Sequence, residues 1–170
     1  MPFAKFYKYL NPVFVETGSY YGDSIKSALD CGFEEIHSIE IADKYFTHCL
    51  RRFENNSRVY LYYGDSSKIL YNVIESIEQP ITFWLDSHWS GDDTGFGSNK
   101  YPLLLELDQI SRHSIKNHTI LIDDIRLLDT EWKLGDIEIV KNKILDINSK
   151  YKLSFEDGFI PNDIMVAEVI

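Results

Sequence analysis

Short apolar runs alternate along the chain with longer stretches in which apolar residues recur at helical spacing. The runs are VFVE (13–16), EIHSIEI (35–41), VYLYY (59–63), ITFWLD (81–86) and TILIDD (119–124), and each has the length and composition of a strand. Helical spacing recurs in 44–53, 69–77, 103–110 and 140–147. This alternation predicts a parallel sheet buried between two layers of helices.

The last twenty residues break the alternation. YKLSFEDG (151–158) and DIMVAEVI (163–170) resemble strands, and the turn between them contains Gly158, Pro161 and Asn162, which leaves no room for a helix. The predicted fold class is therefore α/β, a Rossmann-like three-layer sandwich whose mostly parallel seven-stranded sheet ends in an antiparallel hairpin. No linker or repeat divides the 170 residues, so we expect one domain spanning 1–170.

The charge balance bears on partners and location. Seventeen Lys and Arg residues against 27 Asp and Glu residues give a net charge of −10, which disfavours a nucleic acid or an anionic membrane as partner. The two cysteines, Cys31 and Cys49, do not form a disulfide framework. The N-terminal residues lack a signal-peptide pattern, and no apolar run reaches the roughly 18 residues of a membrane span. We expect a cytoplasmic protein.

Ligands of parallel α/β sheets bind at the carboxyl ends of the strands. After the first run, Gly18 permits a tight turn and Gly22 can begin a helix whose free N–H groups bind an anionic group. The candidate cofactor-binding residues of this turn are Glu16, Thr17, Gly18, Ser19, Tyr21, Gly22, Asp23 and Ser24. The turn lacks the GxGxxG and GK[ST] patterns, and a plain strand–helix connection with Asp23 or Ser24 as helix cap is the alternative.

The next two strand ends carry acids as well. Glu40 ends the second run, where a carboxylate can accept hydrogen bonds from ribose hydroxyls. Asp65 and Ser66 follow the third run, where Asp65 can contact an adenine amine. A solvated carboxylate at Glu40 and a helix cap at Asp65 or Ser66 are the alternatives. Together these positions predict a pocket for an adenosine group.

A cluster of acids follows the fourth and fifth runs. Asp86 and His88 end one run, and Asp123 and Asp124 end the other. Such carboxylates repel one another unless a cation bridges them, and their oxygens suit Mg²⁺, Mn²⁺ or Ca²⁺. Alternatively, Asp123 or Asp124 caps the next segment and His88 is an ordinary loop residue.

The segment 87–101 is long, polar and glycine-rich, which is typical of a lid or a substrate loop. Asp92 and Asp93 could add metal ligands there, although solvated loop acids are the simpler interpretation. The aromatic rings of Tyr20, Tyr21 and Trp89 can stack on a ligand.

The motifs VFVETGSYYGDSI, SIEI, GDSSKIL, FWLDSHWSGDDTGFG and ILIDD, in this order, resemble the class I S-adenosylmethionine-dependent methyltransferases. More narrowly, they are similar to the metal-dependent O-methyltransferases of the catechol type and of the type acting on sugars of macrolides and glycans. The resemblance implies that Glu16 and Gly18 bind the methionine part of the cofactor, Glu40 the ribose and Asp65 the adenine. It places a divalent cation on Asp86, Asp123 and Asp124.

The resulting hypothesis is methyl transfer from S-adenosylmethionine to a hydroxyl group, with Asp86 and His88 as catalytic residues and His88 as general base. The alternatives are a nicotinamide-dependent oxidoreductase, a metal-dependent hydrolase and a binding module without turnover. About a dozen residues precede the first strand, so we expect an open, hydrophilic acceptor site. Such a site suits a saccharide better than an apolar small molecule. A second copy of the chain, in a homodimer, would add to its wall.

Overall fold

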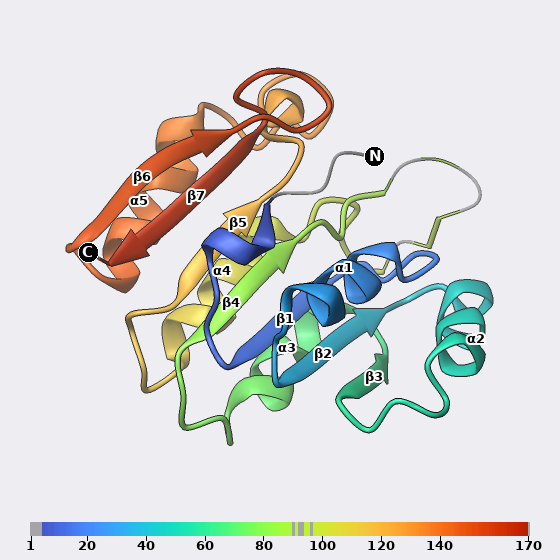
Figure 1. Cartoon of the computed structure of the whole chain (residues 1–170). Coiled ribbons are helices and arrows are strands. Elements are labelled where there is room, and N and C mark those ends of the chain that lie inside the picture. Colours follow the sequence, from blue (N-terminus) through green and yellow to red (C-terminus); the bar gives the residue numbers. More distant parts are fainter. Residues whose placement is uncertain (1–4, 90, 92–93, 96, 170) are drawn as a thin grey trace.

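The computed structural model describes residues 5–89, 91, 94–95 and 97–169. Its strands form a seven-stranded sheet of order β3-β2-β1-β4-β5-β7-β6 (Figure 1). The strands are β1 (Val13–Thr17), β2 (Glu35–Glu40), β3 (Val59–Tyr63), β4 (Ile81–Leu85), β5 (Thr119–Ile122), β6 (Tyr151–Glu156) and β7 (Ile164–Val169). Strands β1 to β5 are parallel, whereas β7 is antiparallel to both β5 and β6. The predicted fold class is confirmed.

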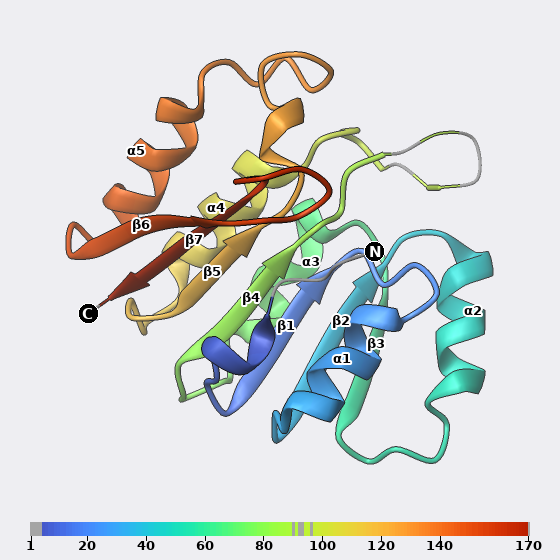
Figure 2. The same cartoon turned by 45° about the horizontal axis from the view of Figure 1, so that its top comes forward.

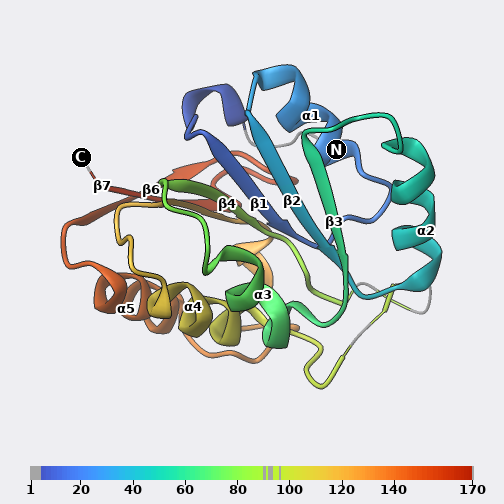
Figure 3. The ribbon, with the colours of Figure 1, turned by 90° about the horizontal axis from the view of Figure 1, so that it is seen from below.

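Helices cover both faces of the sheet. They are α1 (Asp23–Cys31), α2 (Asp43–Arg52), α3 (Ser66–Ile74), α4 (Leu103–Arg112) and α5 (Ile137–Ile147), with short 3-10 turns η1 (Phe6–Lys8) and η2 (Ile125–Leu127). Helices α3, α4 and α5 lie side by side on one face, and α1 lies on the other (Figure 3). Each face has its own apolar cluster, one centred on Phe83, Leu107 and Ile144 and the other on Phe14, Ile25 and Trp84.

Burial of the strands follows their place in the sheet. Every residue of β1, β4 and β5 is buried, because these strands have a neighbour on each side and helices on both faces. The expectation of complete burial is wrong for β3, which lies at the edge of the sheet and leaves Tyr60 and Tyr63 exposed. In strand β6, at the opposite edge, three of the six residues are exposed.

The strand order reverses between β1 and β4, where the chain has first moved outward to β3 and then returned to the centre (Figure 2). At such a point the loops leave the sheet in opposite directions and a crevice opens beyond the strand ends. Gly18 and Asp86 meet there so closely that a side-chain carbon on Gly18, whose φ is +90°, would lie 2.6 Å from the carbonyl oxygen of Asp86. Among the described helices, none has the length and apolar character needed to cross a membrane.

Candidate active site

A cavity of about 580 Å³ lies over the carboxyl ends of β1 to β5. It extends from Gly64, Asp65 and Ser66 after β3, past Glu40, to the acids after β4 and β5. Of the candidate residues predicted from the sequence, Gly18, Glu40, Asp65, Ser66, Asp86, His88, Asp123 and Asp124 line it. Residues from five strand ends and the segment 87–101 thus share one space of the size usual for small-molecule sites.

Glu40 holds a fixed position in this cavity. Its Oε2 accepts a hydrogen bond from the backbone N–H of Tyr20 (2.9 Å), and its Oε1 accepts one from Ala42 (2.7 Å). Burial raises the pKa of Glu40, and the backbone N–H groups partly offset that rise. Backbone N–H groups therefore fix the Glu40 carboxylate where it lines the cavity.

Asp65 caps helix α3, as the alternative interpretation of the sequence had it. Its Oδ1 accepts hydrogen bonds from the backbone N–H (3.0 Å) and the hydroxyl (2.5 Å) of Ser67. Its Oδ2 accepts two more, both 3.0 Å long, from the N–H and hydroxyl of Ser98. Burial opposes ionisation of Asp65, but these hydrogen bonds outweigh it and lower the pKa. The contact also draws residues 97–99 across one end of the cavity.

Glu16 lies beneath the first turn rather than in the cavity. It is fully buried, and its Oε1 accepts a hydrogen bond from Ser38 Oγ (2.6 Å). The Ser38 hydroxyl also contacts Ser19 Oγ. Burial raises the pKa of Glu16 to about 8. Glu16 therefore supports the turn from below and does not line the ligand space.

Six further candidates of this turn do not line the cavity either. Thr17, Ser19 and Ser24 are buried in the protein. Gly22, the N-cap of α1 with φ +80°, packs against Phe53 and Cys49. Asp23 pairs with Arg52 at 2.6 Å, and Tyr21 contacts the rings of Tyr45 and His48. Of the eight candidates in 16–24, only Gly18 lines the cavity.

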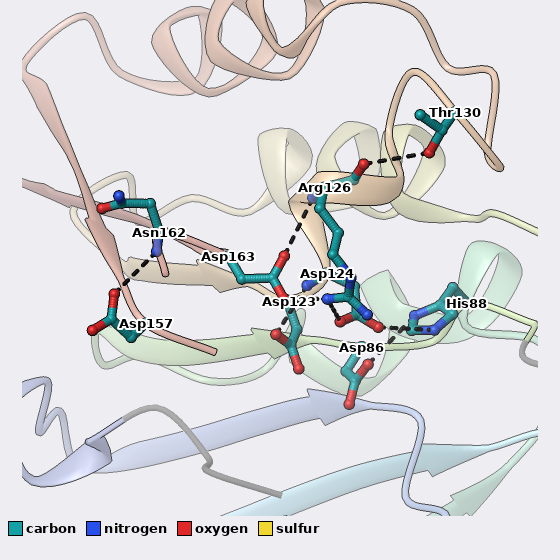
Figure 4. Close-up of polar contacts among 9 residues, drawn as sticks. All are labelled: Asp86, His88, Asp123, Asp124, Arg126, Thr130, Asp157, Asn162 and Asp163. Atoms are coloured by element: carbon teal, nitrogen blue, oxygen red, sulfur yellow. Dashed lines mark hydrogen bonds and ion pairs between the residues drawn. The ribbon is translucent and has the colours of Figure 1, made fainter. Parts of the chain in front are cut away.

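His88 lies between two carboxylates at the other end of the cavity (Figure 4). Its Nε2 is 3.1 Å from Asp124 Oδ2, and its Nδ1 is 3.4 Å from Asp86 Oδ1. Nδ1 is buried and makes no hydrogen bond among the described residues. Burial lowers the pKa of His88, although Asp124 acts in the opposite direction. A neutral His88 that donates from Nε2 to Asp124 keeps a free lone pair on Nδ1.

The neighbouring acids repel one another. Burial, reinforced by Asp123 and Asp124, raises the pKa of Asp86 well above its usual range. Burial and the charge of Asp124 likewise raise the pKa of Asp123 to about 7. The Arg126 guanidinium contacts Asp124 and also Asp163, the buried acid directly before β7 (Figure 4).

Two groups of side chains bring metal-ligating atoms within 4.8 Å of one another among the described residues: Asp86 with His88 and Asp124, and Asp123 with Asp124 and Asp163. Arg126 already neutralises two members of the second group. The first group fits a divalent cation, because it combines two carboxylates with a buried imidazole nitrogen that has no hydrogen bond. The predicted ligands Asp86, Asp123 and Asp124 therefore share one edge of the sheet but belong to two groups. Asp92 and Asp93 lie outside the described residues.

Several residues of the site were not among the predicted ones. Tyr45 lines the cavity from α2, next to Tyr20 at a ring distance of 4.4 Å. Arg126 and Asp163 organise the acid cluster, and Glu106 on α4 lies buried beneath the cavity. The helical spacing of 103–110 could have singled out Glu106, the one acid that falls on the apolar face of that helix. Contacts such as Arg126 with Asp163 join distant segments and leave no local pattern.

Comparison with known proteins gives matches of structure only. No model of a protein family matches the chain, and no curated protein sequence matches it. The O-methyltransferase TomG of Streptomyces achromogenes, solved with SAM, matches with a TM-score of 0.69 and 14% identity over 96% of this chain and 75% of its own. SMU.1697c of Streptococcus mutans, solved with SAH, matches with a TM-score of 0.65 and 11% identity over 93% of this chain and 88% of its own.

A third structure is the SAH-bound methyltransferase PaMTH1 of Podospora anserina, with a TM-score of 0.62 and 13% identity over 94% of this chain and 72% of its own. At these identities the likeness concerns the fold. The chain has the Rossmann-like fold found in S-adenosylmethionine-dependent methyltransferases, including O-methyltransferases.

Proposed function

We propose that the protein transfers a methyl group from S-adenosylmethionine to a hydroxyl group of a saccharide acceptor. The observation that carries the proposal is the single cavity that joins Glu40 to the cluster of Asp86, His88 and Asp124. A ribose-binding carboxylate and a basic group then face the same space, as a nucleoside-linked donor and a hydroxyl acceptor require. The fold, shared with methyltransferases solved with SAM or SAH, supports the same function.

The residues present fit the methyl donor. Glu40 lines the cavity, where its carboxylate would accept hydrogen bonds from the two ribose hydroxyls, and Gly18 lets the backbone approach the ligand where a side chain would collide with Asp86. Ile39, Ile41 and Pro102 add apolar wall for a flat base. S-adenosylmethionine, when bound, supplies the methyl group as an activated electrophile, so holding both reactants in line accounts for much of the rate.

While no cation is bound, His88 is the general base of the proposal. Asp124 Oδ2 lies 3.1 Å from Nε2, where it would accept the N–H of a neutral imidazole, so that Nδ1 is the nitrogen able to take the proton of the acceptor hydroxyl. Trp132 packs against the imidazole with ring centroids 5.1 Å apart and limits its rotation. Arg126 holds Asp124 in turn.

A divalent cation is part of the proposal. Asp86, His88 and Asp124 would hold it, and this mixed oxygen and nitrogen ligand set favours Mn²⁺ over Mg²⁺ or Ca²⁺. When bound, it would lower the pKa of the acceptor hydroxyl. In that state His88 would act as a ligand, and either Asp123 or solvent would take the proton.

The saccharide acceptor follows from the polar wall. The acceptor end is lined by Asp86, His88, Asp123 and Asp124. Vicinal hydroxyl groups of a sugar match these acceptors and a cation, whereas a flavonoid would meet little apolar surface.

The experiment is a methyl-transfer screen of nucleotide sugars, oligosaccharides, catechols and small phenols, each with Mn²⁺, Mg²⁺, Ca²⁺ or EDTA. Turnover of saccharides that depends on the cation is the expected result. Turnover confined to catechols and phenols would overturn the saccharide acceptor, and full activity in EDTA would overturn the cation. The absence of transfer to any acceptor, with NAD bound in place of SAH, would favour an oxidoreductase.

A further inference from the structure

Glu106 lies beneath the cavity and connects two of its walls. It is a buried residue of α4, only 1% exposed. Its Oε1 accepts hydrogen bonds from Ser66 Oγ and from Ser87 Oγ, each 2.5 Å long. Ser66 begins α3 and Ser87 follows β4, and both residues line the cavity. One carboxyl oxygen therefore ties the turn after β3 to the turn after β4.

A second residue of α4 reinforces this connection. Gln109 donates from Nε2 to the carbonyl oxygen of Ser66 (2.9 Å) and accepts at Oε1 from the backbone N–H of Tyr71 (2.9 Å). Both ends of Ser66, its hydroxyl and its carbonyl, are thus held by α4. Glu106 and Gln109 are thus polar residues on a helix face that is otherwise buried by Leu103, Leu107 and Ile110.

The direction of these hydrogen bonds determines what the serines can offer to a ligand. A hydroxyl has one proton and two lone pairs. Because Ser66 and Ser87 both commit their protons to Glu106, their oxygens can only accept a hydrogen bond from a ligand. Burial raises the pKa of Glu106, but a proton on Oε2 would leave Oε1 as the acceptor for both serines.

The neighbouring acid, Asp65, has no lone pair left to accept a hydrogen bond from a ligand. Each oxygen of Asp65 already accepts two hydrogen bonds, from Ser67 on one side and from Ser98 on the other. Two bonds fill the two lone pairs of a carboxylate oxygen. At this end of the cavity, Ser66 Oγ is therefore a side-chain acceptor with capacity left, whereas Asp65 is not.

We propose that Glu106 is a positioning residue that presents Ser66 and Ser87 as hydrogen-bond acceptors and thereby selects a purine with an amino group over one with an oxo group. The inference rests on the proposed function, because it concerns the base of the methyl donor. With the ribose on Glu40 and the sulfur facing His88, the base lies toward Ser66, against Ile41 and Pro102. An adenine amine donates to the serine oxygens, whereas a 6-oxo group would face their lone pairs.

The test compares two ligands, S-adenosylhomocysteine and its deaminated analogue S-inosylhomocysteine, by titration calorimetry. The wild-type protein should prefer the adenine ligand by at least tenfold. Glu106→Gln keeps an acceptor oxygen for both serines and should keep the preference. Glu106→Ala frees the serine protons, and Ser66→Ala removes the acceptor, so each should reduce the preference at least threefold.

Asp108→Asn, a change on the exposed side of the same helix, is the matched control and should leave the preference unchanged. Thermal melts of each variant show whether it is folded. If Glu106→Ala and Ser66→Ala bind the adenine ligand tightly and keep the wild-type preference, the proposed role of Glu106 is overturned. The proposed function is then unaffected. Equal losses in Glu106→Gln and Glu106→Ala would also overturn the role of Glu106, because packing would then explain both. If the wild-type protein binds neither ligand, the proposed function itself fails.

Discussion

Nε2 of His88 lies 3.1 Å from Oδ2 of Asp124. Asp124 adopts a left-handed backbone conformation, with φ 55°, immediately after β5. Residues other than glycine rarely adopt this conformation, and it recurs at functional sites that the surrounding structure holds in place. Here the Arg126 guanidinium holds the same carboxylate. The orientation of the imidazole thus depends in part on a residue whose left-handed backbone conformation places its carboxylate beside the ring.

Replacement of Asp124 by asparagine should reduce methyl transfer strongly and leave donor binding intact. The amide has the size of the carboxylate but cannot orient or stabilise the imidazole in the same way, and it is a poor cation ligand. We expect a loss of about 100-fold or more in kcat, measured with the best acceptor from the screen. Asp129→Asn, in the loop after η2, is the control. A variant with nearly full activity would show that Asp124 does not support His88.

Arg126 should contribute to stability through Asp163. That carboxylate is buried, and removal of Arg126 leaves it without its cationic partner. Loss of one partner of a buried ion pair costs about 3–5 kcal/mol, and the partial exposure of Arg126 places the effect of Arg126→Met toward the lower end. Adding Asp163→Asn should restore part of the free energy of unfolding, measured by urea denaturation. An equal or larger loss in the double variant would argue against the pairing.

Glu16 should make the protein less stable as the pH rises. Its pKa in the folded protein is about 8, above its ordinary value near 4.5, because it is buried. Between these values the folded state binds more protons than the unfolded state, so the free energy of unfolding falls as the pH rises from about 5 to 8. Denaturation of the wild-type protein and Glu16→Gln at several pH values measures the effect. The variant should show the flatter profile, and parallel profiles would contradict the prediction.

His118 should make the protein less stable as the pH falls, the opposite of the dependence expected for Glu16. It lies fully buried at the opposite end of β5 from the cavity, accepts the N–H of Ile81 at Nδ1 (3.1 Å) and lies 3.1 Å from His113 Nδ1 at Nε2. Burial and the nearby His113 lower its pKa to about 3 from the ordinary 6.5. The unfolded state therefore binds more protons, and stability falls as the pH drops from 6.5 toward 3. His118→Gln should weaken this acid dependence in pH-dependent thermal melts. An unchanged slope would mean that other groups cause it.

Much of the fold was predictable because it depends on local pattern. The run VYLYY matches β3 residue for residue, and the hairpin after residue 150 follows from a turn too short for a helix. The position of β3 at the edge of the sheet was not predictable, because the order of strands in a sheet depends on contacts between distant segments. The exposure of Tyr60 and Tyr63 shows the consequence.

The site was predictable where it depends on strand ends. Glu40, Asp86 and Asp124 reach the cavity because parallel strands end at one edge of the sheet. The turn 16–24 was harder, since its sequence does not reveal that Glu16 turns inward toward Ser38. Glu106 and Arg126 act through partners about 20 to 40 residues away, on other elements, and such contacts have no sequence signature.

The central claim is that the cavity binds the methyl donor with its ribose on Glu40. Titration calorimetry with S-adenosylhomocysteine on the wild-type protein, Glu40→Ala and the control Glu35→Ala, at the opposite and exposed end of β2, tests it most directly. Two charge-assisted hydrogen bonds of about 1.5–3 kcal/mol each predict at least tenfold weaker binding in Glu40→Ala and no change in the control. Unchanged affinity in a folded Glu40→Ala variant, or no binding to the wild-type protein, would contradict the claim.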